Sequence, residues 1–321
     1  MEKLLSIVIP TLNRYQYLKR TLDLIIPQVQ RNIEEVELVI CCNSSKDETD
    51  EYVKSLLPQY PFIRYKYFDE YVEVGQSLIR SVGEATGKFV VLWGDDDIPY
   101  PCFVREMLNI INTNKDIGLI HCNRLIGKDG KYSIAKLQVQ NKKIDPDSPR
   151  VMSLEELVQN FTIFLGFISS LVFRKEDFLS AVNCYSSEHY GFEHLGIIVN
   201  GAKGKSCYYY PYPLEIQRVP YNRDFSDKWP LYRFVGIPNM MSDFDNAGIT
   251  HNAKESFLSS RHHSLPDFIW NMSYTTLNRS YYKKRMKELN KYQTSKFRKI
   301  LTYLIVYFMP SSLFILLRRK H

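Results

Sequence analysis

The sequence predicts an α/β fold in which helices flank a mostly parallel sheet and a helical extension follows. Between residues 4 and 113, short apolar runs alternate with segments whose apolar residues recur at helical spacing. This alternation is typical of parallel strands joined by helices. Three consecutive carboxylates, Asp95, Asp96 and Asp97, follow one of these strands. Because ligands in open α/β sheets bind beyond the carboxyl ends of the strands, the triplet marks the candidate site.

Four buried strands are expected in the first hundred residues, at 4–9, 36–41, 63–68 and 88–93. The segments 4–9, 36–41 and 88–93 are apolar runs of the kind found in the middle of a parallel sheet, and 63–68 is a further strand candidate. Helices are expected between them: one with apolar residues at helical spacing from Tyr17 to Ile26, and two more at 47–57 and 75–85. The first helix is expected to end at Pro27, because proline lacks the amide hydrogen that a helix interior uses.

The second half is predicted to complete the sheet. A strand at 118–123 is followed by a polar, hairpin-like segment at 124–150, and a capping signal at Ser153 to Glu156 opens a helix. Residues 167–173 are expected to be extended, 190–195 to start a helix, and 207–219 to form late edge strands or loops. We therefore divide the chain into residues 1–222 (halves 1–123 and 124–222) and a helical, basic extension, 223–321.

Composition and charge limit the kinds of partner. An apolar content of 45% excludes a disordered chain. The net charge of +7 is concentrated at the end, since residues 251–321 contain 14 Lys and Arg against 3 Asp and Glu. A basic segment of this kind favours an anionic partner, either a membrane or a nucleic acid. No nucleic-acid recognition motif is present, so we expect a membrane surface and no nucleic acid.

The cysteines and the first residues predict a cytoplasmic protein. Six cysteines lack the spacing of a zinc site and several lie in apolar runs, which is typical of buried, reduced thiols. Met1 is followed directly by the first strand, without the apolar stretch of a signal peptide.

The acidic triplet has two interpretations. Adjacent carboxylates repel one another, so their clustering is costly unless a cation compensates them. Their oxygens suit Mg²⁺ or Mn²⁺, which usually bind through one or two carboxylates and the phosphates of a substrate. The alternative is an acidic turn capping the strand, in which Asp97 prepares a turn at Pro99. The buried strand before the triplet favours the metal.

Three motifs carry a resemblance to a known family: PTLNR at 10–14, VICCNSSKDET at 39–49 and KFVVLWGDDDIPYP at 88–101. In this order they resemble the nucleotide-binding half of a family 2 glycosyltransferase of the GT-A fold. The bacterial abequosyltransferase-like group, which carries GDDD and acts on surface polysaccharide, is the most similar in character. The resemblance implies a GT-A nucleotide-diphospho-sugar transferase fold. It also implies metal-dependent transfer of a hexose or deoxyhexose from a UDP-, dTDP- or CDP-sugar to a lipid-linked saccharide, in O-antigen or capsule synthesis.

The resemblance also implies roles for individual residues. The nucleotide-sugar would be bound by Pro10, Thr11, Asn13, Arg14, Cys42, Asn43, Asp95, Asp96 and Arg218. The metal would be held by Asp96, with Asp95 or Asp97 as the second contact. The sequence departs from the family where Cys42 replaces an aspartate, Ser77 an asparagine and Gly94 the first aspartate of D-x-D. A thiol cannot accept the hydrogen bonds that a carboxylate would, so the identity of the base stays open.

The resemblance places the catalytic base in a short acidic sequence that opens a helix after the metal motif. Glu193 in GFEHLG is the best match, with His194 as the alternative and Glu188 or Asp177 as further candidates. Glu193 could instead only favour a helix N-terminus electrostatically. A base-activated hydroxyl attacking in line predicts inversion at the anomeric carbon. The rival functions are a non-catalytic nucleotide- or saccharide-binding protein and a nucleotidyltransferase on a similar sheet.

The C-terminal segment combines positive charge with apolar residues. Residues 279–299 are dense in Lys and Arg, and the apolar run at 300–317 is interrupted by Pro310. Because a bilayer span needs about 20 apolar residues, this run favours two short helices in the interface, on the inner face of the plasma membrane. The alternative is a buried helix pair that packs on the catalytic domain.

Overall fold

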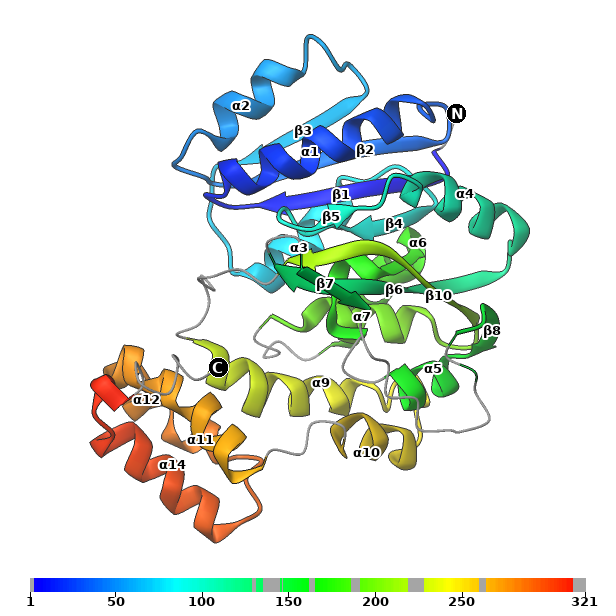
Figure 1. The fold of residues 1–321 in the computed structure, drawn as a ribbon. Helices are drawn as coiled ribbons and strands as arrows, with labels where there is room; N and C mark the ends of the chain where they lie inside the picture. The colour runs from blue at the N-terminus through cyan, green and yellow to red at the C-terminus, as the bar shows by residue number, and fades with distance from the viewer. Residues whose placement is uncertain are drawn as a thin grey trace.

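The structure is a computed structural model, and it describes residues 3–128, 131–134, 145, 147–161, 165–185, 191–218, 228–259 and 264–313. Among these residues, one mixed sheet runs through the molecule in the order β3-β2-β1-β4-β9-β6-β10-β5. Two further strands extend it, because β7 pairs with β6 and β8 pairs with β10. Helices lie on both faces of the sheet, and a group of C-terminal helices lies below it (Figure 1).

The first half has the predicted alternation. Its strands are β1 (Leu5–Thr11), β2 (Val36–Asn43), β3 (Ile63–Phe68) and β4 (Phe89–Leu92). The helices between them are α1 (Tyr15–Gln30), α2 (Thr49–Leu56) and α3 (Val74–Gly83). β1 pairs in parallel with both β2 and β4. The carboxyl ends of these strands therefore lie along one edge of the sheet.

The expectation that the first helix ends at Pro27 is wrong. α1 continues through Pro27 to Gln30. The carbonyl that would have bonded to the missing amide belongs to Asp23, on the exposed side of the helix, where water can bond to it. The side chain of Gln28 also holds this turn in place, since its Nε2 donates to the carbonyl of Tyr100 at 2.9 Å.

The second half completes a mixed, mostly parallel sheet, as predicted. Its strands are β5 (Ile98–Pro99), β6 (Ile117–Lys128), β7 (Lys131–Ile134), β8 (Arg150–Ser153), β9 (Leu171–Arg174) and β10 (Ser206–Arg218). Its helices are α4 (Phe103–Thr113), α5 (Leu154–Phe161), α6 (Lys175–Ala181) and α7 (Glu193–Gly201). β6 and β7 form an antiparallel pair, and Ser153 and Glu156 exchange the hydrogen bonds of a capping box at the start of α5.

β10 corrects the expectation of late edge strands. It is a single strand between β6 and β5, inside the sheet. Its interior position suits its sequence, since Cys207, Tyr209 and Leu214 are buried. Its prolines do not break the pairing because the register with β6 shifts between Tyr210 and Pro213. Such irregularities are where a strand tolerates proline.

The sheet is covered by apolar clusters on both faces. One cluster joins α1 and α4 to the sheet through residues such as Leu22 and Met107. The other joins α3, α5, α6 and α7 through residues such as Leu78, Leu157 and Leu195. The sheet is thus the middle layer of three, which leaves its edges available for a site.

The C-terminal helices contribute to two cores. They are α8 (Trp229–Leu231), α9 (Ile237–Asp243), α10 (His251–Ser259), α11 (Leu265–Ser273), α12 (Arg279–Lys284), α13 (Met286–Leu289) and α14 (Lys296–Phe308). Met240 and Phe244, near the end of α9, join the cluster of α3 and α7. Residues of α11 to α14 form a third cluster with Leu231 and Phe234. Within the described ranges, no helix is long and apolar enough to cross a membrane.

Candidate active site

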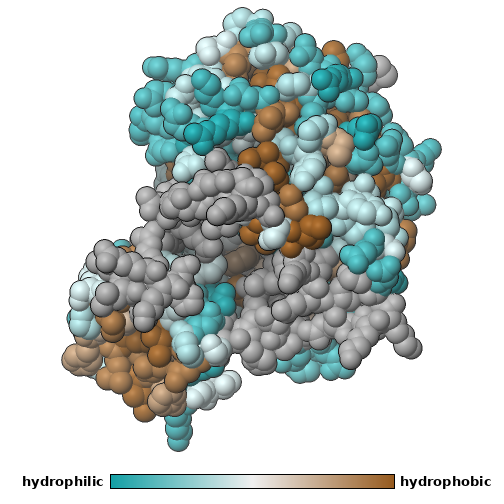
Figure 2. Space-filling view, viewed as in Figure 1, coloured by the Kyte–Doolittle hydropathy of each residue, from teal (hydrophilic) through white to brown (hydrophobic). Residues whose placement is uncertain are grey.

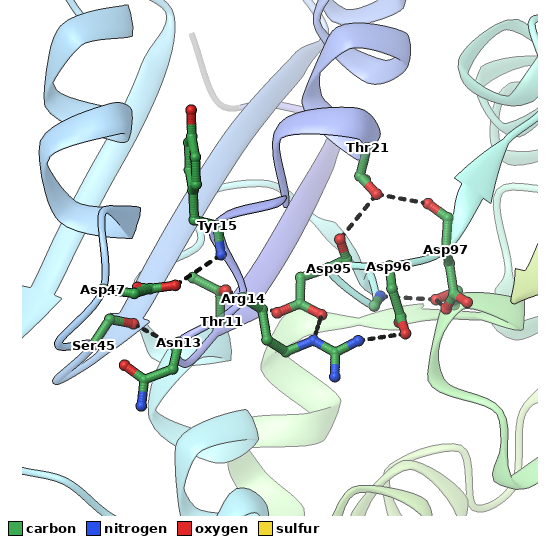
Figure 3. Close-up of polar contacts among 12 residues, drawn as sticks. Thr11, Asn13, Arg14, Tyr15, Thr21, Ser45, Asp47, Asp95, Asp96 and Asp97 are labelled. Atoms are coloured by element: carbon green, nitrogen blue, oxygen red, sulfur yellow. Dashed lines mark hydrogen bonds and ion pairs between the residues drawn. The ribbon is translucent and has the colours of Figure 1, made fainter. Parts of the chain in front are cut away.

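The acidic triplet lies at the carboxyl edge of the sheet, against the loop that follows β1 (Figure 3). Thr11 Oγ1 donates a hydrogen bond to Asp95 Oδ2 at 2.8 Å. Arg14 bridges two carboxylates, since its Nε lies 2.8 Å from Asp95 Oδ1 and its Nη2 pairs with Asp96 Oδ2. The structure therefore brings together four of the residues that the sequence assigned to the site: Thr11, Arg14, Asp95 and Asp96.

Two hydroxyl groups that the sequence did not indicate hold the triplet in place. Thr21 Oγ1, on α1, lies 3.0 Å from the carbonyl oxygens of both Asp95 and Asp97. Ser169 Oγ donates to Asp97 Oδ2 at 2.6 Å and accepts from the amide of Gly94 at 2.9 Å. Asp95 and Asp97 are buried, so the triplet is a built cluster and not a solvated acidic turn.

The geometry gives a steric reason for Gly94, which stands where the family usually has the first aspartate of D-x-D. A Cβ atom at Gly94 would overlap the carboxylate of Asp97 and come within 3.5 Å of Ser169 Oγ. Asp97 is short and buried, so it has little room to give way. A side chain at position 94 is therefore incompatible with this placement of Asp97.

We expect Gly94→Ala to displace Asp97, to lower the free energy of unfolding by about 1–3 kcal/mol as overpacked sites do, and to lower the activity. Thermal unfolding and a transfer assay measure the two effects. Gly83→Ala is the matched control, because nothing lies within 4 Å of a Cβ there. That control should be about 0.5–1 kcal/mol more stable, since alanine favours a helix over glycine. An active Gly94→Ala enzyme of unchanged stability would contradict the steric argument.

The cluster contains more carboxyl groups than cationic side chains, so ionising all of them would be costly without a further cation. Burial raises the pKa of Asp95 to about 7, despite the opposing effect of Arg14. Burial and the charge of Asp96 raise the pKa of Asp97 to about 8. Glu215, fully buried on β10, adds a fourth carboxylate whose pKa burial also raises, against the attraction of Arg124. A divalent cation would relieve this excess, so the residues fit the implied Mg²⁺ or Mn²⁺.

Asp96 is best placed to hold such a cation. Both oxygens of Asp95 already have partners, whereas the side chain of Asp96 is 19% exposed at the mouth of the cluster. The described part of the chain contains no group of three or more His, Cys, Asp or Glu side chains arranged to hold a metal. Mg²⁺ does not require one, since one or two carboxylates and a diphosphate are sufficient.

The end of β2 forms a wall beside the cluster. The amide of Asn43 binds both polar backbone groups of Val72, through Nδ2–O at 2.9 Å and Oδ1–N at 3.2 Å. Cys42 is fully buried. The backbone amide of Asn13 donates a hydrogen bond to Ser45 Oγ at 2.9 Å. Asn43 thus organises the segment that precedes α3, and base contacts from Asn43 and Cys42 stay predictions.

Glu193 reaches the same edge of the sheet from α7. The far end of that helix, Gly201, packs on the backbone of Asp177 at the start of α6. α6 follows β9, whose antiparallel pairing with β4 ends beside Phe89, at the opposite edge. The first residue of α7 therefore points toward the carboxyl edge, where its carboxylate packs on Gly75 at the start of α3.

The environment of Glu193 suits a base. Its Oε2 accepts a hydrogen bond from the amide of Gly191 at 2.8 Å. Burial raises the pKa of its carboxyl group above the ordinary value, which brings it nearer to the range in which a general base works best. Two glycines allow this placement: Gly191 has a φ of 97°, and a Cβ at Gly75 would overlap the Glu193 carboxylate.

The other sequence candidates are placed less favourably or lie outside the described residues. Asp177 lies at the opposite edge of the sheet and pairs with Lys205, which excludes it as the base. The buried ring of His194 stacks on Phe192, and its role stays a prediction. Glu188 is outside the described residues. For Arg218 only the backbone, paired with β6 at the end of β10, is described.

The fold defines a class of protein, the GT-A glycosyltransferases. A mixed, mostly parallel sheet flanked by helices, with a helical C-terminal part, is the arrangement that this chain shares with solved glycosyltransferase structures. The model of Glycosyl transferase family 2 matches residues 6–176, more than half of the chain. The chain therefore belongs to glycosyltransferase family 2.

Related proteins of low sequence identity are also glycosyltransferases. Abequosyltransferase RfbV of Salmonella typhimurium is 25% identical over 77% of this chain and 77% of its own length. A glucosyltransferase of Campylobacter jejuni that acts on GalNAc(5)-diNAcBac-PP-undecaprenol is 26% identical over 64% of this chain and 61% of its own. An uncharacterised glycosyltransferase of Rickettsia prowazekii is 26% identical over 54% of this chain. The chain spans only 52% of that protein and 18% of one from Rickettsia bellii.

Solved structures confirm the predicted fold. TarS of S. aureus in complex with UDP-GlcNAc superposes with a TM-score of 0.60 at 12% identity, over 99% of this chain and 92% of that one. A mannosyltransferase of Pyrobaculum calidifontis in complex with GDP-Man and Mn²⁺ gives 0.53 at 14% identity, over 96% and 88%. At such identities the likeness shows the fold alone.

Proposed function

We propose that this chain is an inverting, metal-dependent glycosyltransferase. It moves a hexose or deoxyhexose from a nucleotide-diphospho-sugar to a hydroxyl of a lipid-linked saccharide, in bacterial surface polysaccharide synthesis. One observation carries the proposal. The buried cluster of Asp95 to Asp97 and a separate carboxylate with a raised pKa, Glu193, reach the same edge of the sheet from different elements. The relatives that act on a PP-undecaprenol-linked saccharide or transfer abequose support this choice.

In this proposal the protein performs two tasks. Asp96, with Asp97 behind it, would hold Mg²⁺ or Mn²⁺, which supplies positive charge for the departing diphosphate. Arg14 fixes Asp96 and Asp95 in position before the donor arrives. Glu193 takes the proton of the acceptor hydroxyl as that oxygen bonds to the anomeric carbon on the face opposite the nucleotide. The bond to the nucleotide breaks in the same step, so the anomeric configuration inverts.

The proposed acceptor determines the cellular location that we propose. A saccharide on a polyprenyl diphosphate lies at the membrane, so we assign this chain to the cytoplasm, peripheral on the inner face of the plasma membrane. The C-terminal extension, 223–321, is the membrane-associating unit of this proposal. In Figure 1 the helices α11, α12 and α14 of this extension lie together at the lower left, whereas α10 lies beside α5.

A thermal-shift screen tests the donor and the metal together. UDP-, dTDP- and CDP-sugars, each with and without Mn²⁺, should include one that raises the unfolding temperature of the full chain only when Mn²⁺ is present. That donor is then assayed for transfer to lipid-linked saccharides. Binding of nucleotide and metal without turnover on any acceptor would favour a non-catalytic binding protein, and no binding at all would refute the proposal.

A further inference from the structure

The outer face of α14 is apolar although it is exposed. Phe297, Ile300 and Phe308 have 59%, 60% and 66% of their surface accessible, and Leu304 has 47%. Their spacing of three or four residues places these four side chains in one row along the helix. We call this row the α14 stripe. In Figure 2 an apolar patch covers the region of α14 at the lower left of the molecule.

The opposite face of α14 is already used. Ile305, Val306 and Met309 are buried in the cluster formed with α11, α12 and α13. The stripe is therefore not the core-packing face of a displaced helix. It is a second apolar surface on a helix that is already packed, and exposed apolar patches of this kind mark interaction sites.

Positive charge surrounds the stripe. The exposed lysines of α12 to α14 and the turn between them are Lys283, Lys284, Lys287, Lys291, Lys296 and Lys299. The one acidic residue between 279 and 313 is Glu288, which pairs with Arg285 at 3.6 Å. A cleft of about 500 Å³ between α13 and α14 has Lys287 and Lys299 beside Ile300 and Tyr303. It offers cations and apolar atoms to the same ligand.

We infer that the α14 stripe and these lysines form a docking surface for an anionic phospholipid bilayer, on which α14 lies flat. The stripe would enter the acyl-chain boundary while the lysines contact lipid phosphates. At 13 residues, or about 20 Å, α14 is too short to cross a core of about 30 Å. A second copy of this chain is a poor occupant, because it would bring the same positive charge to the interface. The inference rests on the proposed membrane association and names the surface, the lipid class and the orientation.

Vesicle sedimentation of the full-length chain tests this surface. The wild type should bind vesicles that contain phosphatidylglycerol, and more weakly those of phosphatidylcholine alone. Ile300→Glu/Phe308→Glu should lower the partition coefficient at least about tenfold, since it removes two inserted side chains and adds two negative charges. The control Leu24→Glu/Leu179→Glu replaces leucines that are 44% and 39% exposed on the catalytic domain, and should bind like the wild type.

A charge-reversal pair tests the lysines separately. Lys287→Glu/Lys299→Glu should reduce binding to anionic vesicles at least about tenfold, because each cation near an anionic surface contributes roughly fivefold. Lys88→Glu/Lys115→Glu, which reverses exposed lysines on the catalytic domain, should have little effect. If both double variants bind anionic vesicles equally well, Lys287 and Lys299 do not contact the lipid phosphates.

A tryptophan at the stripe gives a readout that does not depend on a loss of binding. The wild type has three tryptophans of its own, so the readout is the fluorescence that Phe308→Trp adds to theirs. This added signal should shift to shorter wavelength on anionic vesicles and be quenched by brominated lipids. Leu24→Trp should show neither effect. Strong vesicle binding without quenching at position 308 would refute the stripe and leave membrane association intact. If the wild type is dimeric in solution and binds no vesicles, a second copy and not a lipid bilayer covers the stripe. Nucleotide binding and transfer to a soluble acceptor test the proposed transferase function separately from this surface.

Discussion

The Glu193→Gln enzyme should transfer sugar about 10²–10⁴-fold more slowly than the wild type while its affinity for the nucleotide-sugar hardly changes. Glutamine keeps the size of the side chain and can still accept from the amide of Gly191, but it cannot take a proton. Single-turnover rates and donor affinity from thermal shift separate chemistry from binding. In the wild type the rate should fall with decreasing pH at a higher pH than an ordinary glutamate would give, because burial raises the pKa of Glu193.

Two further variants distinguish a base from a helix-capping charge. Glu176→Gln removes an exposed carboxylate from the first turn of α6, as Glu193→Gln does in the first turn of α7, and should leave the rate unchanged. Gly75→Ala keeps Glu193 but forces its carboxylate to move, so it should also slow transfer. If Glu193→Gln lowers only the unfolding temperature and leaves turnover intact, Glu193 is a capping residue and the base lies elsewhere.

The Asp96→Asn enzyme should lose about 10²–10³-fold or more in turnover, the effect expected when an electrostatic contact to the leaving group is removed. Mn²⁺ should no longer increase the rise in unfolding temperature that the nucleotide-sugar gives this variant. This thermal-shift readout is independent of activity. Asp116→Asn, at an exposed aspartate, is the control. Full activity in a chain with all three triplet aspartates replaced by alanine would refute the role of the cluster.

The first half of the fold could be predicted because its signals are local. The strands β1, β2 and β4 are apolar runs, and each helix between the first four strands has its own periodicity. The prediction at Pro27 was wrong because the sequence does not show which way the carbonyl of Asp23 faces. Pro27 leaves this carbonyl without its helical hydrogen bond, and the structure places Asp23 on the exposed side of the helix. The interior position of β10 was missed for a different reason: its partners β6 and β5 precede it by about a hundred residues, and nothing local specifies that pairing.

The candidate site was predictable to a similar extent. The triplet was found because its three residues are adjacent at the end of an apolar strand. Ser169 could not be found, since a serine carries no signal until β9 pairs with β4 and brings it to Asp97. Thr21 offered a weak signal, as a hydroxyl on the apolar face of α1 beside Leu18 and Leu22. Sequence reasoning therefore finds the acidic side chains of the candidate site but not the hydroxyl groups that hold them in place.

The hydrogen bonds of Ser169 have a consequence for how such genes can recombine. The serine that fastens Asp97 comes from the half after residue 123, and β9 is inserted between β4 and β6. The segments before and after residue 123 are thus interleaved in one sheet and cannot be exchanged as independent units. A chimera joined at residue 123 would need a parent with a hydroxyl at 169 to keep its acidic cluster in place. Point substitutions, which keep this hydrogen bond, are therefore a safer way to vary the protein than exchanging the two segments.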